Sequence, residues 1–273
     1  MKAKKKFGQN FLVSPHHLGL LDKSVGNFIE VAKPKHILEV GPGLGALTQI
    51  ILKNTNLPLE CWEIDPEAVD FLQKTEYINK IDLIQRDALD YLDTKNKEED
   101  FQFRTDSVLI SNLPYNVGSR ILIELALLHA QPLGFLVMLQ KEVGLKLLAR
   151  DKNINLIGAF LRIYYEFKIV ANFPRSAFSP QPNVESVLVQ GLIKNNLNLD
   201  FAFSNKSKTL TTLKKLLIYP SKTLANNLKN LDWDKEKIEQ FLEINKLDKN
   251  IRLEWENYII ILGLVLERLT WQF

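Results

Sequence analysis

Short apolar runs alternate with amphipathic stretches through the first two-thirds of the chain. The runs are continuously apolar, which is typical of strands buried on both faces. We expect these strands at residues 36–40, 59–64, 81–84, 107–111, 133–139, 157–169 and 184–193. Helical spacing predicts helices between them, at residues 44–53, 118–128 and 141–149 and from Pro66 onward. The alternation predicts an α/β fold with an open, mainly parallel sheet and helices on both faces.

After residue 194 the apolar residues recur at helical spacing only. The apolar residues there predict helices at residues 206–218, 221–228, 235–245 and 254–269. The polar stretch Lys194-Asn195-Asn196 separates the two patterns. We therefore expect two domains, a larger one over residues 1–196 and a small all-helical one over residues 197–273.

Composition excludes several classes of protein. The 273 residues are 46% hydrophobic and 25% charged, as in an ordinary globular protein. The single cysteine, Cys61, rules out an intramolecular disulfide and a cysteine-based zinc cluster, and the four histidines lack metal-ligand spacing. The longest apolar run, residues 259–266, has eight residues and is too short to span a bilayer. We expect a soluble cytoplasmic monomer without a metal site.

Positive charge is unevenly distributed, although the net charge is only +3. Residues 194–229 carry seven lysines and one acid, whereas residues 230–273 carry nine acids and six bases. Four more lysines lie within residues 2–6. A phosphate backbone would be attracted to such clusters, but a solvated lysine-rich surface explains the charge equally well.

A glycine-rich turn, Gly41-Pro42-Gly43-Leu44-Gly45, joins the first strand to the helix after it. Glycines let the backbone turn sharply and leave room for a ligand, and the helix start offers free N–H groups. Glu63 ends the second strand, where its carboxylate could accept both ribose hydroxyls of an adenosine. Asp87 follows the third strand, where it could accept from an adenine amine or simply cap a helix. These features fit a nicotinamide cofactor as well as S-adenosylmethionine.

The tetrapeptide Asn112-Leu113-Pro114-Tyr115 follows the fourth strand, at the edge where open sheets bind ligands. The amine of an adenine is a poor nucleophile because its lone pair is delocalised into the ring. The Asn112 side-chain oxygen and the Leu113 carbonyl could accept the amine hydrogens, while Pro114 restricts the chain. Tyr115 offers a ring on which the base could stack. The tetrapeptide therefore favours methyl transfer to an adenine amine by in-line displacement, a step governed mainly by positioning.

Seven motifs in the same order resemble the ribosomal RNA adenine N6-dimethyltransferases, in particular those of the small (16S) subunit. They lie at residues 6–12, 38–48, 63–65, 87–89, 112–116, 139–143 and 178–186, so the resemblance covers nearly the whole chain. It implies a Rossmann-like, class I S-adenosylmethionine-dependent methyltransferase sheet with a small helical C-terminal domain that docks RNA. It also implies an enzyme that forms N6,N6-dimethyladenosine at two adjacent adenosines of 16S ribosomal RNA during ribosome biogenesis.

The resemblance also implies which residues hold the cofactor. Asn10 and Leu12 would close over S-adenosylmethionine, and Gly41 would approach its methionine part. Glu63 would hold the ribose, and Asp87 the adenine ring. The full cofactor set comprises Asn10, Leu12, Gly41, Gly43, Glu63, Ile64, Asp87, Ala88 and Asn112.

The catalytic residues implied by the resemblance surround the target base. Asn112 would lie between the methyl donor and the acceptor, and Phe178 would face Tyr115 across the target adenine. Phe178 could instead be a core aromatic at the entry of a strand. The full catalytic set comprises Asn112, Leu113, Pro114, Tyr115 and Phe178.

The sequence departs from the family pattern at three places. Gly118 stands where the family usually has a serine, and Arg162 where a glutamine is common near the sixth strand. Pro220-Ser221-Lys222 replaces the usual Arg-Arg-Lys, which removes two arginines that could bind phosphate.

Three alternatives remain open. A large-subunit (23S) ribosomal RNA adenine N6-methylase of the macrolide-resistance type shares the catalytic motif. A non-catalytic ribosome assembly factor could retain the fold. A nicotinamide oxidoreductase shares the glycine turn, but the chain offers no acid or base for hydride transfer near the strand ends. Residues 112–116 and the basic segment favour the small-subunit enzyme, with 16S ribosomal RNA in the small subunit or its precursor as partner.

Overall fold

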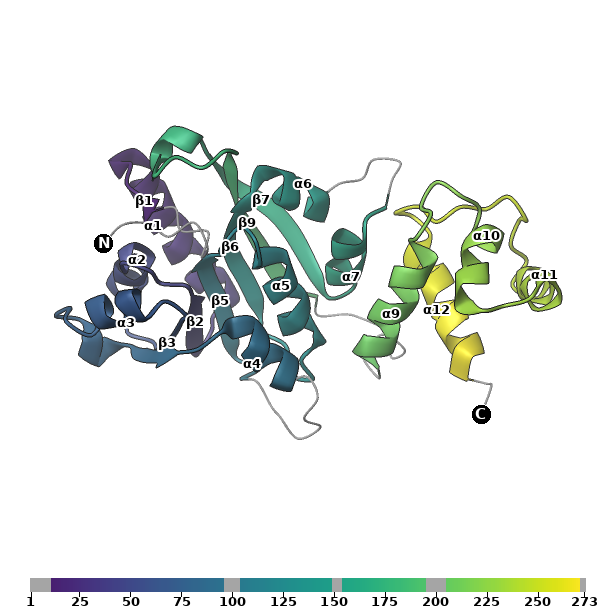
Figure 1. Cartoon of the computed structure of the whole chain (residues 1–273), viewed down its shortest axis with the longest axis horizontal. Helices are drawn as coiled ribbons and strands as arrows, with labels where there is room; N and C mark the ends of the chain where they lie inside the picture. Colours follow the sequence, from purple (N-terminus) through teal and green to yellow (C-terminus); the bar gives the residue numbers. More distant parts are fainter. Residues whose placement is uncertain (1–10, 96–103, 149–153, 195–204, 271–273) are drawn as a thin grey trace. The chain divides into compact units, whose positions relative to one another are not determined.

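The computed structural model describes residues 11–95, 104–148, 154–194 and 205–270 (Figure 1). Contacts divide the chain into two compact units, residues 1–145 with 165–193 and residues 146–164 with 194–273. The chain therefore passes from one unit to the other three times. The single domain boundary expected after residue 196 falls outside the described residues.

A seven-stranded sheet forms the first unit, in the order β4-β3-β2-β5-β6-β9-β7. Strands β2 to β6 pair in parallel, whereas β9 runs antiparallel to both β6 and β7. The open, mainly parallel sheet predicted from the apolar runs is confirmed. The strands are β2 (His36–Val40), β3 (Leu59–Glu63), β4 (Asp82–Gln85), β5 (Ser107–Asn112), β6 (Gly134–Gln140), β7 (Tyr165–Phe173) and β9 (Ser186–Ile193).

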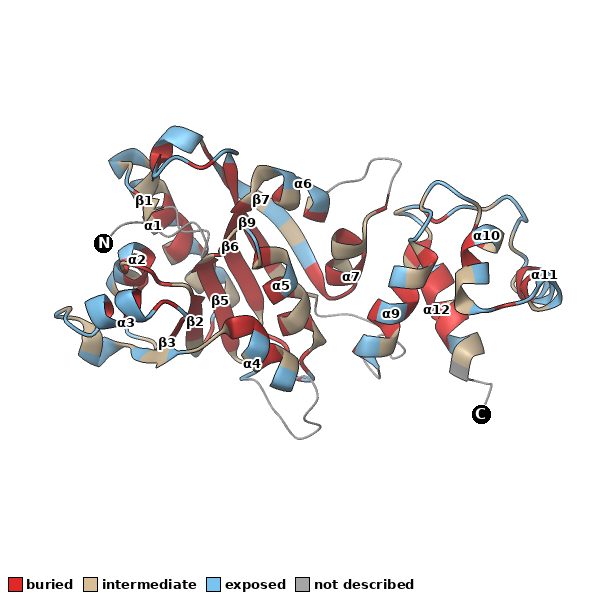
Figure 2. Cartoon of the chain, viewed as in Figure 1, coloured by how far each residue is buried: buried red, intermediate tan, exposed pale blue. Residues whose placement is uncertain are grey.

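Helices cover both faces of this sheet (Figure 1), and its strands are buried along most of their length (Figure 2). On one face, Phe28 of α1 and Ile51 of α2 join a core that includes Cys61 of β3. On the other face, Tyr91 of α4 meets Trp62 edge to face, with 5.0 Å between ring centroids. The helices of this part are α1 (Pro15–Ala32), α2 (Ala46–Asn54), α3 (Pro66–Leu72), α4 (Ala88–Lys95), α5 (Gly118–Leu127) and α6 (Lys141–Leu148).

The single strand predicted over residues 157–169 is wrong, because α7 (Leu156–Tyr164) precedes β7 there. Arg162 is the one charged residue within residues 157–164. The run therefore lacks the polar face from which a helical period could be recognised. A short apolar run cannot be assigned to helix or strand by periodicity alone. The overlooked signal is Asn155, whose side-chain oxygen accepts the Gly158 N–H at 2.9 Å and caps the helix.

The second unit is helical in its described residues, as expected for the C-terminal part of the chain. Within it α9 packs against α7, α10 and α12. Arg162 belongs to α7 and not to a strand. Its guanidinium lies 4.6 Å from the ring centroid of Trp255. The C-terminal helices are α9 (Lys206–Leu216), α10 (Leu224–Leu228), α11 (Lys235–Ile244) and α12 (Tyr258–Thr270).

Candidate active site

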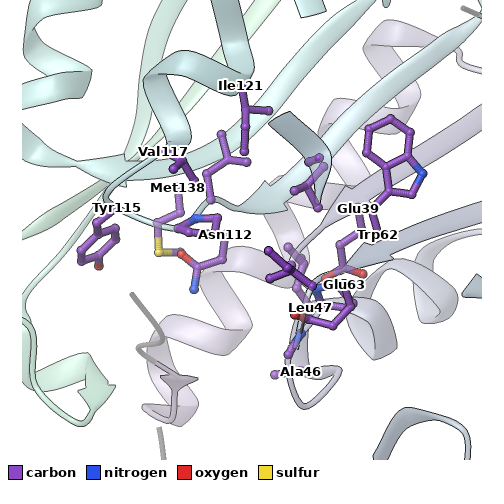
Figure 3. Close-up of a pocket in the computed structure, with 18 of the residues that line it drawn as sticks. Glu39, Ala46, Leu47, Trp62, Glu63, Asn112, Tyr115, Val117, Ile121 and Met138 are labelled. Carbon is purple, nitrogen blue, oxygen red and sulfur yellow. Dashed lines mark hydrogen bonds between the residues drawn. The ribbon is translucent and has the colours of Figure 1, made fainter. Parts of the chain in front are cut away.

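A cavity of about 320 Å³ opens at the carboxyl ends of the parallel strands. The sheet extends in opposite directions from the neighbouring strands β2 and β5, because β3 and β4 follow on the β2 side and β6 follows on the β5 side. Open α/β sheets bind ligands at such a switch point. Figure 3 shows residues that line the cavity, with Asn112 between Tyr115 and Glu63 in this view.

Most of the predicted site residues line this one cavity. Phe178 does not, because it lies in β8 (Phe178–Ser179), which pairs with β1 (Phe11–Leu12), and its side chain is 2% exposed. Its ring centroid is 6.4 Å from that of Phe173, within the core. Asn10 lies outside the described residues. The predicted residues that line the cavity are Leu12, Gly41, Gly43, Glu63, Ile64, Asp87, Ala88, Asn112, Leu113, Pro114 and Tyr115.

The glycine turn after β2 is held in a backbone conformation that requires glycine. Gly41, Gly43 and Gly45 all have positive φ. At Gly45 a Cβ would also overlap the phenol oxygen of Tyr77. The N–H of Gly43 donates to Oε2 of Glu63 at 3.0 Å, so the turn is bound to the end of β3.

Glu63 is a buried carboxylate with backbone partners on both oxygens. Its Oε1 accepts the N–H of Asp65 at 2.9 Å, while Oε2 accepts that of Gly43. Burial raises the pKa of Glu63, and these backbone hydrogen bonds offset part of the rise. A carboxylate oxygen can accept more than one hydrogen bond, so Glu63 keeps capacity for a ligand hydroxyl.

Glu39 lines the cavity as well, and sequence reasoning gave it no role. Its side chain is 1% exposed, and Oε2 accepts from the Thr48 hydroxyl at 2.8 Å and from the Cys61 thiol at 3.8 Å. Burial raises the pKa of Glu39 to about 8, so this carboxyl holds a proton at neutral pH. The sequence feature that could have pointed to Glu39 is a single carboxylate within an otherwise mostly apolar strand.

Asp87 caps α4, with Oδ1 accepting the Leu89 N–H at 2.8 Å, so the capping interpretation is confirmed. Its neighbour Arg86 also lines the cavity and was not predicted. The Arg86 guanidinium lies 4.0 Å from the ring centroid of Tyr91 and 5.1 Å from that of Trp62. Stacking on two rings fixes this cation beside Asp87.

The tetrapeptide of residues 112–115 begins at Asn112, the last residue of β5. Leu113 is 1% exposed, and the carbonyl of Pro114 accepts the N–H of Val117 at 3.1 Å and that of Gly118 at 2.9 Å. The chain therefore turns tightly from β5 into α5. A Cβ at Gly118 would lie 3.0 Å from the Leu113 Cβ, so the glycine lets α5 start close to the tetrapeptide.

Tyr115 is tied to the first residue of β9. Its phenol oxygen and the hydroxyl of Ser186 are 2.5 Å apart, and Ser186 is fully buried. Burial raises the pKa of Tyr115, and this hydrogen bond offsets part of the rise. Sequence reasoning placed Ser186 in a motif but missed this contact, because no pattern along the chain links residues so far apart.

Among the residues that the structure describes, no group of three or more histidine, cysteine or acidic side chains could hold a metal ion. Over the same residues no helix is long and apolar enough to cross a membrane.

The sheet, the glycine turn and the cavity define a Rossmann-like fold with a ligand site at the carboxyl ends of its parallel strands. The chain superposes on a dimethyladenosine transferase from Plasmodium falciparum with a TM-score of 0.63 and 22% identity, covering 95% of this chain and 89% of the other. The 23S rRNA methyltransferase ErmE gives a TM-score of 0.62 and 19% identity, covering 96% of this chain and 100% of the other. At these sequence identities the two structures support a shared fold and nothing more specific.

Sequence comparison identifies the family. A family model described as ribosomal RNA adenine dimethylase matches residues 1–261. Ribosomal RNA small subunit methyltransferase A from Mycoplasma mobile is 34% identical over 252 residues, which cover 91% of each chain. The chain belongs to the ribosomal RNA adenine dimethylase family. The nicotinamide oxidoreductase alternative is thereby excluded.

Proposed function

We propose that the protein transfers methyl groups from S-adenosylmethionine to the N6 amines of two adjacent adenosines in 16S ribosomal RNA of the small subunit. The observation that carries this proposal is that Asn112 and Tyr115 line the same cavity as Gly43 and Glu63. A base on Tyr115 and a cofactor on Glu63 would meet at Asn112. The similarity to the small subunit methyltransferase A of Mycoplasma mobile supports the choice of subunit. We place the reaction in the cytoplasm, carried out by a monomer.

The donor groups of the cavity suit S-adenosylmethionine, which supplies a methyl group on a sulfonium centre when it is bound. The glycine turn leaves space that side chains would fill. Glu63 would accept the ribose hydroxyls with its remaining acceptor capacity. Asp87 and Ala88 would lie against the adenine, and Leu12 would cover the site.

The residues of the tetrapeptide would prepare the acceptor amine. Oδ1 of Asn112 and the carbonyl of Leu113 would accept its hydrogens, which favours a more tetrahedral and more nucleophilic nitrogen. No side chain has to take a proton before transfer. Tyr115 would stack on the base, and its bond to Ser186 would hold the ring. Phe178 would complete a clamp only by turning out of the core.

The choice of RNA can be tested with ribosomal subunits that lack dimethyladenosine. Purified small and large subunits would be incubated with the protein and labelled S-adenosylmethionine, and the modified positions mapped. We expect N6,N6-dimethyladenosine at adjacent adenosines of the small subunit only. Transfer confined to the large subunit would instead support the macrolide-resistance type. Failure to transfer despite cofactor and RNA binding would support an assembly factor.

The cofactor site is tested by Glu63→Ala. Loss of this charged acceptor should weaken binding of S-adenosylmethionine at least about tenfold, as measured by calorimetry. Asp70→Ala removes an exposed carboxylate from α3 and serves as the control, with an unchanged dissociation constant. If the Glu63 variant also binds like the wild type, Glu63 does not hold the cofactor.

A further inference from the structure

Arg86 brings a positive charge to the cavity, and the proposed reaction gives this charge no task. The residue follows β4 and lines the cavity, and its backbone N–H donates to the Glu63 carbonyl at 3.0 Å. Among the residues that the structure describes, no carboxylate forms an ion pair with its guanidinium. A cation beside a ligand site and without an anionic partner is available to the ligand.

Two aromatic rings hold the guanidinium in place. Its central carbon lies 4.0 Å from the ring centroid of Tyr91 and 5.1 Å from that of Trp62. Figure 3 shows Trp62 on the same side of the cavity as Glu63. The stack compensates part of the charge, but it uses none of the N–H groups as hydrogen-bond donors. A guanidinium fixed in this way loses little conformational entropy when it donates to a ligand.

One end of the guanidinium is covered by protein. Nη1 is buried, and it has no hydrogen-bond partner in the described part of the chain. A buried donor that remains unpaired costs free energy, so the guanidinium is not explained by contacts within the protein alone. The other N–H groups of this side chain remain donors for a molecule in the cavity.

Arg86 and Asp87 together present a donor and an acceptor side by side. Oδ1 of Asp87 accepts the N–H of Leu89 at 2.8 Å, so Oδ2 keeps its capacity to accept from a ligand. The edge of adenine carries the complementary pattern, because its amine donates beside a ring nitrogen that accepts. The two neighbouring side chains therefore match two neighbouring groups of one base.

We propose that Arg86 recognises the adenine of S-adenosylmethionine by donating from its guanidinium to N1 or N7, the ring nitrogens beside the amine that Asp87 accepts. The inference rests on the proposed function in taking S-adenosylmethionine as the ligand. It adds a residue that the cofactor set derived from the family resemblance does not contain. The methionine carboxylate is the other strong acceptor of this cofactor, but in the proposed orientation it lies toward Gly41 and not toward Asp87.

The test compares how the wild type and Arg86→Met bind S-adenosylhomocysteine and two analogues in which CH replaces N1 or N7. Calorimetric titrations use the full chain without RNA. Methionine keeps an apolar stem against the two rings but has no N–H group. We expect Arg86→Met to bind S-adenosylhomocysteine at least about tenfold more weakly than the wild type. One of the two analogues should bind the wild type more weakly by a similar factor, and it should bind Arg86→Met with no further loss.

Arg120→Met is the matched control, because Arg120 is an exposed arginine of α5 that does not line the cavity. It should leave all three affinities unchanged. Wild-type affinity in Arg86→Met, a similar loss in Arg120→Met, or the same ratios between the three ligands in the wild type and Arg86→Met would overturn the proposal. A fold defect lowers all three affinities by one factor, so these ratios separate recognition from damage. The wild type alone is decisive if Arg86→Met does not fold, since equal affinity for all three ligands would also overturn the proposal.

Methyl transfer to small subunits by the wild type is measured in parallel, to separate this inference from the proposed reaction. Transfer by a wild type that binds all three ligands equally would overturn the role of Arg86 alone. Discrimination between the analogues that depends on Arg86, without any transfer, would overturn the proposed reaction and support the role of Arg86. A wild type that binds no S-adenosylhomocysteine would overturn both.

Discussion

Asn112 and Tyr115 perform different tasks in the proposed reaction, although both come from one turn. Asn112 ends β5 and offers an oxygen to the amine. Tyr115 has its phenol oxygen hydrogen-bonded to Ser186, and its task in the proposed reaction is to stack its ring on the base. The two side chains should therefore give different kinetic signatures when they are replaced.

Asn112→Ala should slow methyl transfer at least about a hundredfold at saturating cofactor, because one preorganised acceptor for the amine hydrogens is lost. The measurement is single-turnover transfer, with cofactor affinity determined separately. A substrate that already carries one methyl has one amine hydrogen left, so its transfer should be slowed less. Asn172→Ala, at an exposed position of β7, is the control. Wild-type rates for both additions in Asn112→Ala would disprove amine activation.

Tyr115→Phe and Ser186→Ala should each reduce transfer by about threefold to tenfold, because each removes the same hydrogen bond. The double variant should be no slower than the slower single variant, which a double-mutant cycle measures. Ser107→Ala, which deletes a buried hydroxyl bonded to the Arg104 carbonyl at the other end of β5, should have no effect on the rate. Multiplied losses in the double variant would show that the hydrogen bond does not position Tyr115.

Residue identity and order along the chain were sufficient to predict much of the cavity lining. Glu63 and Asn112 could be assigned because each ends a parallel strand, and such ends meet at one edge. Phe178 could not be placed, because its burial depends on pairing between two very short strands. Ser186 and Arg86 were missed because their contacts depend on side-chain packing between elements.

At the level of elements, buried polar contacts join β2, α2 and β3 beneath the glycine turn. Glu39 of β2 accepts from Thr48 of α2 and from Cys61 of β3. All three side chains are buried, so the contacts are shielded from water. These contacts tie α2 to both strands through the Glu39 carboxyl.

Glu39 should make stability depend on pH. Its pKa is about 8 in the folded chain, against 4.5 for an ordinary glutamate. Between these values the folded state binds one more proton than the unfolded state, so the free energy of unfolding falls as pH rises. The glutamine in Glu39→Gln cannot titrate. The free energy of unfolding of this variant should therefore fall less steeply between pH 5 and 8, by up to the slope that one bound proton contributes. Urea unfolding across that range measures it, and an unchanged slope in Glu39→Gln would contradict the prediction.

The elements themselves were predicted where periodicity or strand length was distinctive. Strands β2 to β6 could be located from their apolar runs, whereas α7 could not, because a short and mostly apolar run fits a helix and a buried strand equally well. The late start of α10 at Leu224 reflects the turn fixed by Asn227, a contact that sequence spacing does not reveal.

In the whole molecule, the cavity and the lysine-rich segment belong to different units. The cavity carries the groups proposed for chemistry, and the lysines of the helical unit are those that a phosphate backbone would attract. Substitutions in one unit should therefore alter binding without altering the chemical groups of the other.

RNA affinity should fall with salt, and this dependence should weaken when lysines of the helical unit are replaced. Lys214, Lys215 and Lys222 changed together to glutamine should flatten the slope of log affinity against log salt by about two, at roughly 0.7 for each phosphate that is no longer neutralised. Lys235, Lys246 and Lys249, in the acidic part of the same unit, form the control triplet. Equal slopes for the wild type and the first triplet would assign RNA docking elsewhere.

The placement of α7 affects how the protein is made. This helix belongs to the C-terminal unit, yet β7 and β9 of the sheet are translated between it and its partner α9. During synthesis the ribosome therefore releases α7, with its buried Phe160 and Tyr164, before the surface that covers it exists. A chain ended after β9 would keep an uncovered apolar helix. The nascent chain therefore needs its C-terminal helices before the apolar side chains of α7 are covered.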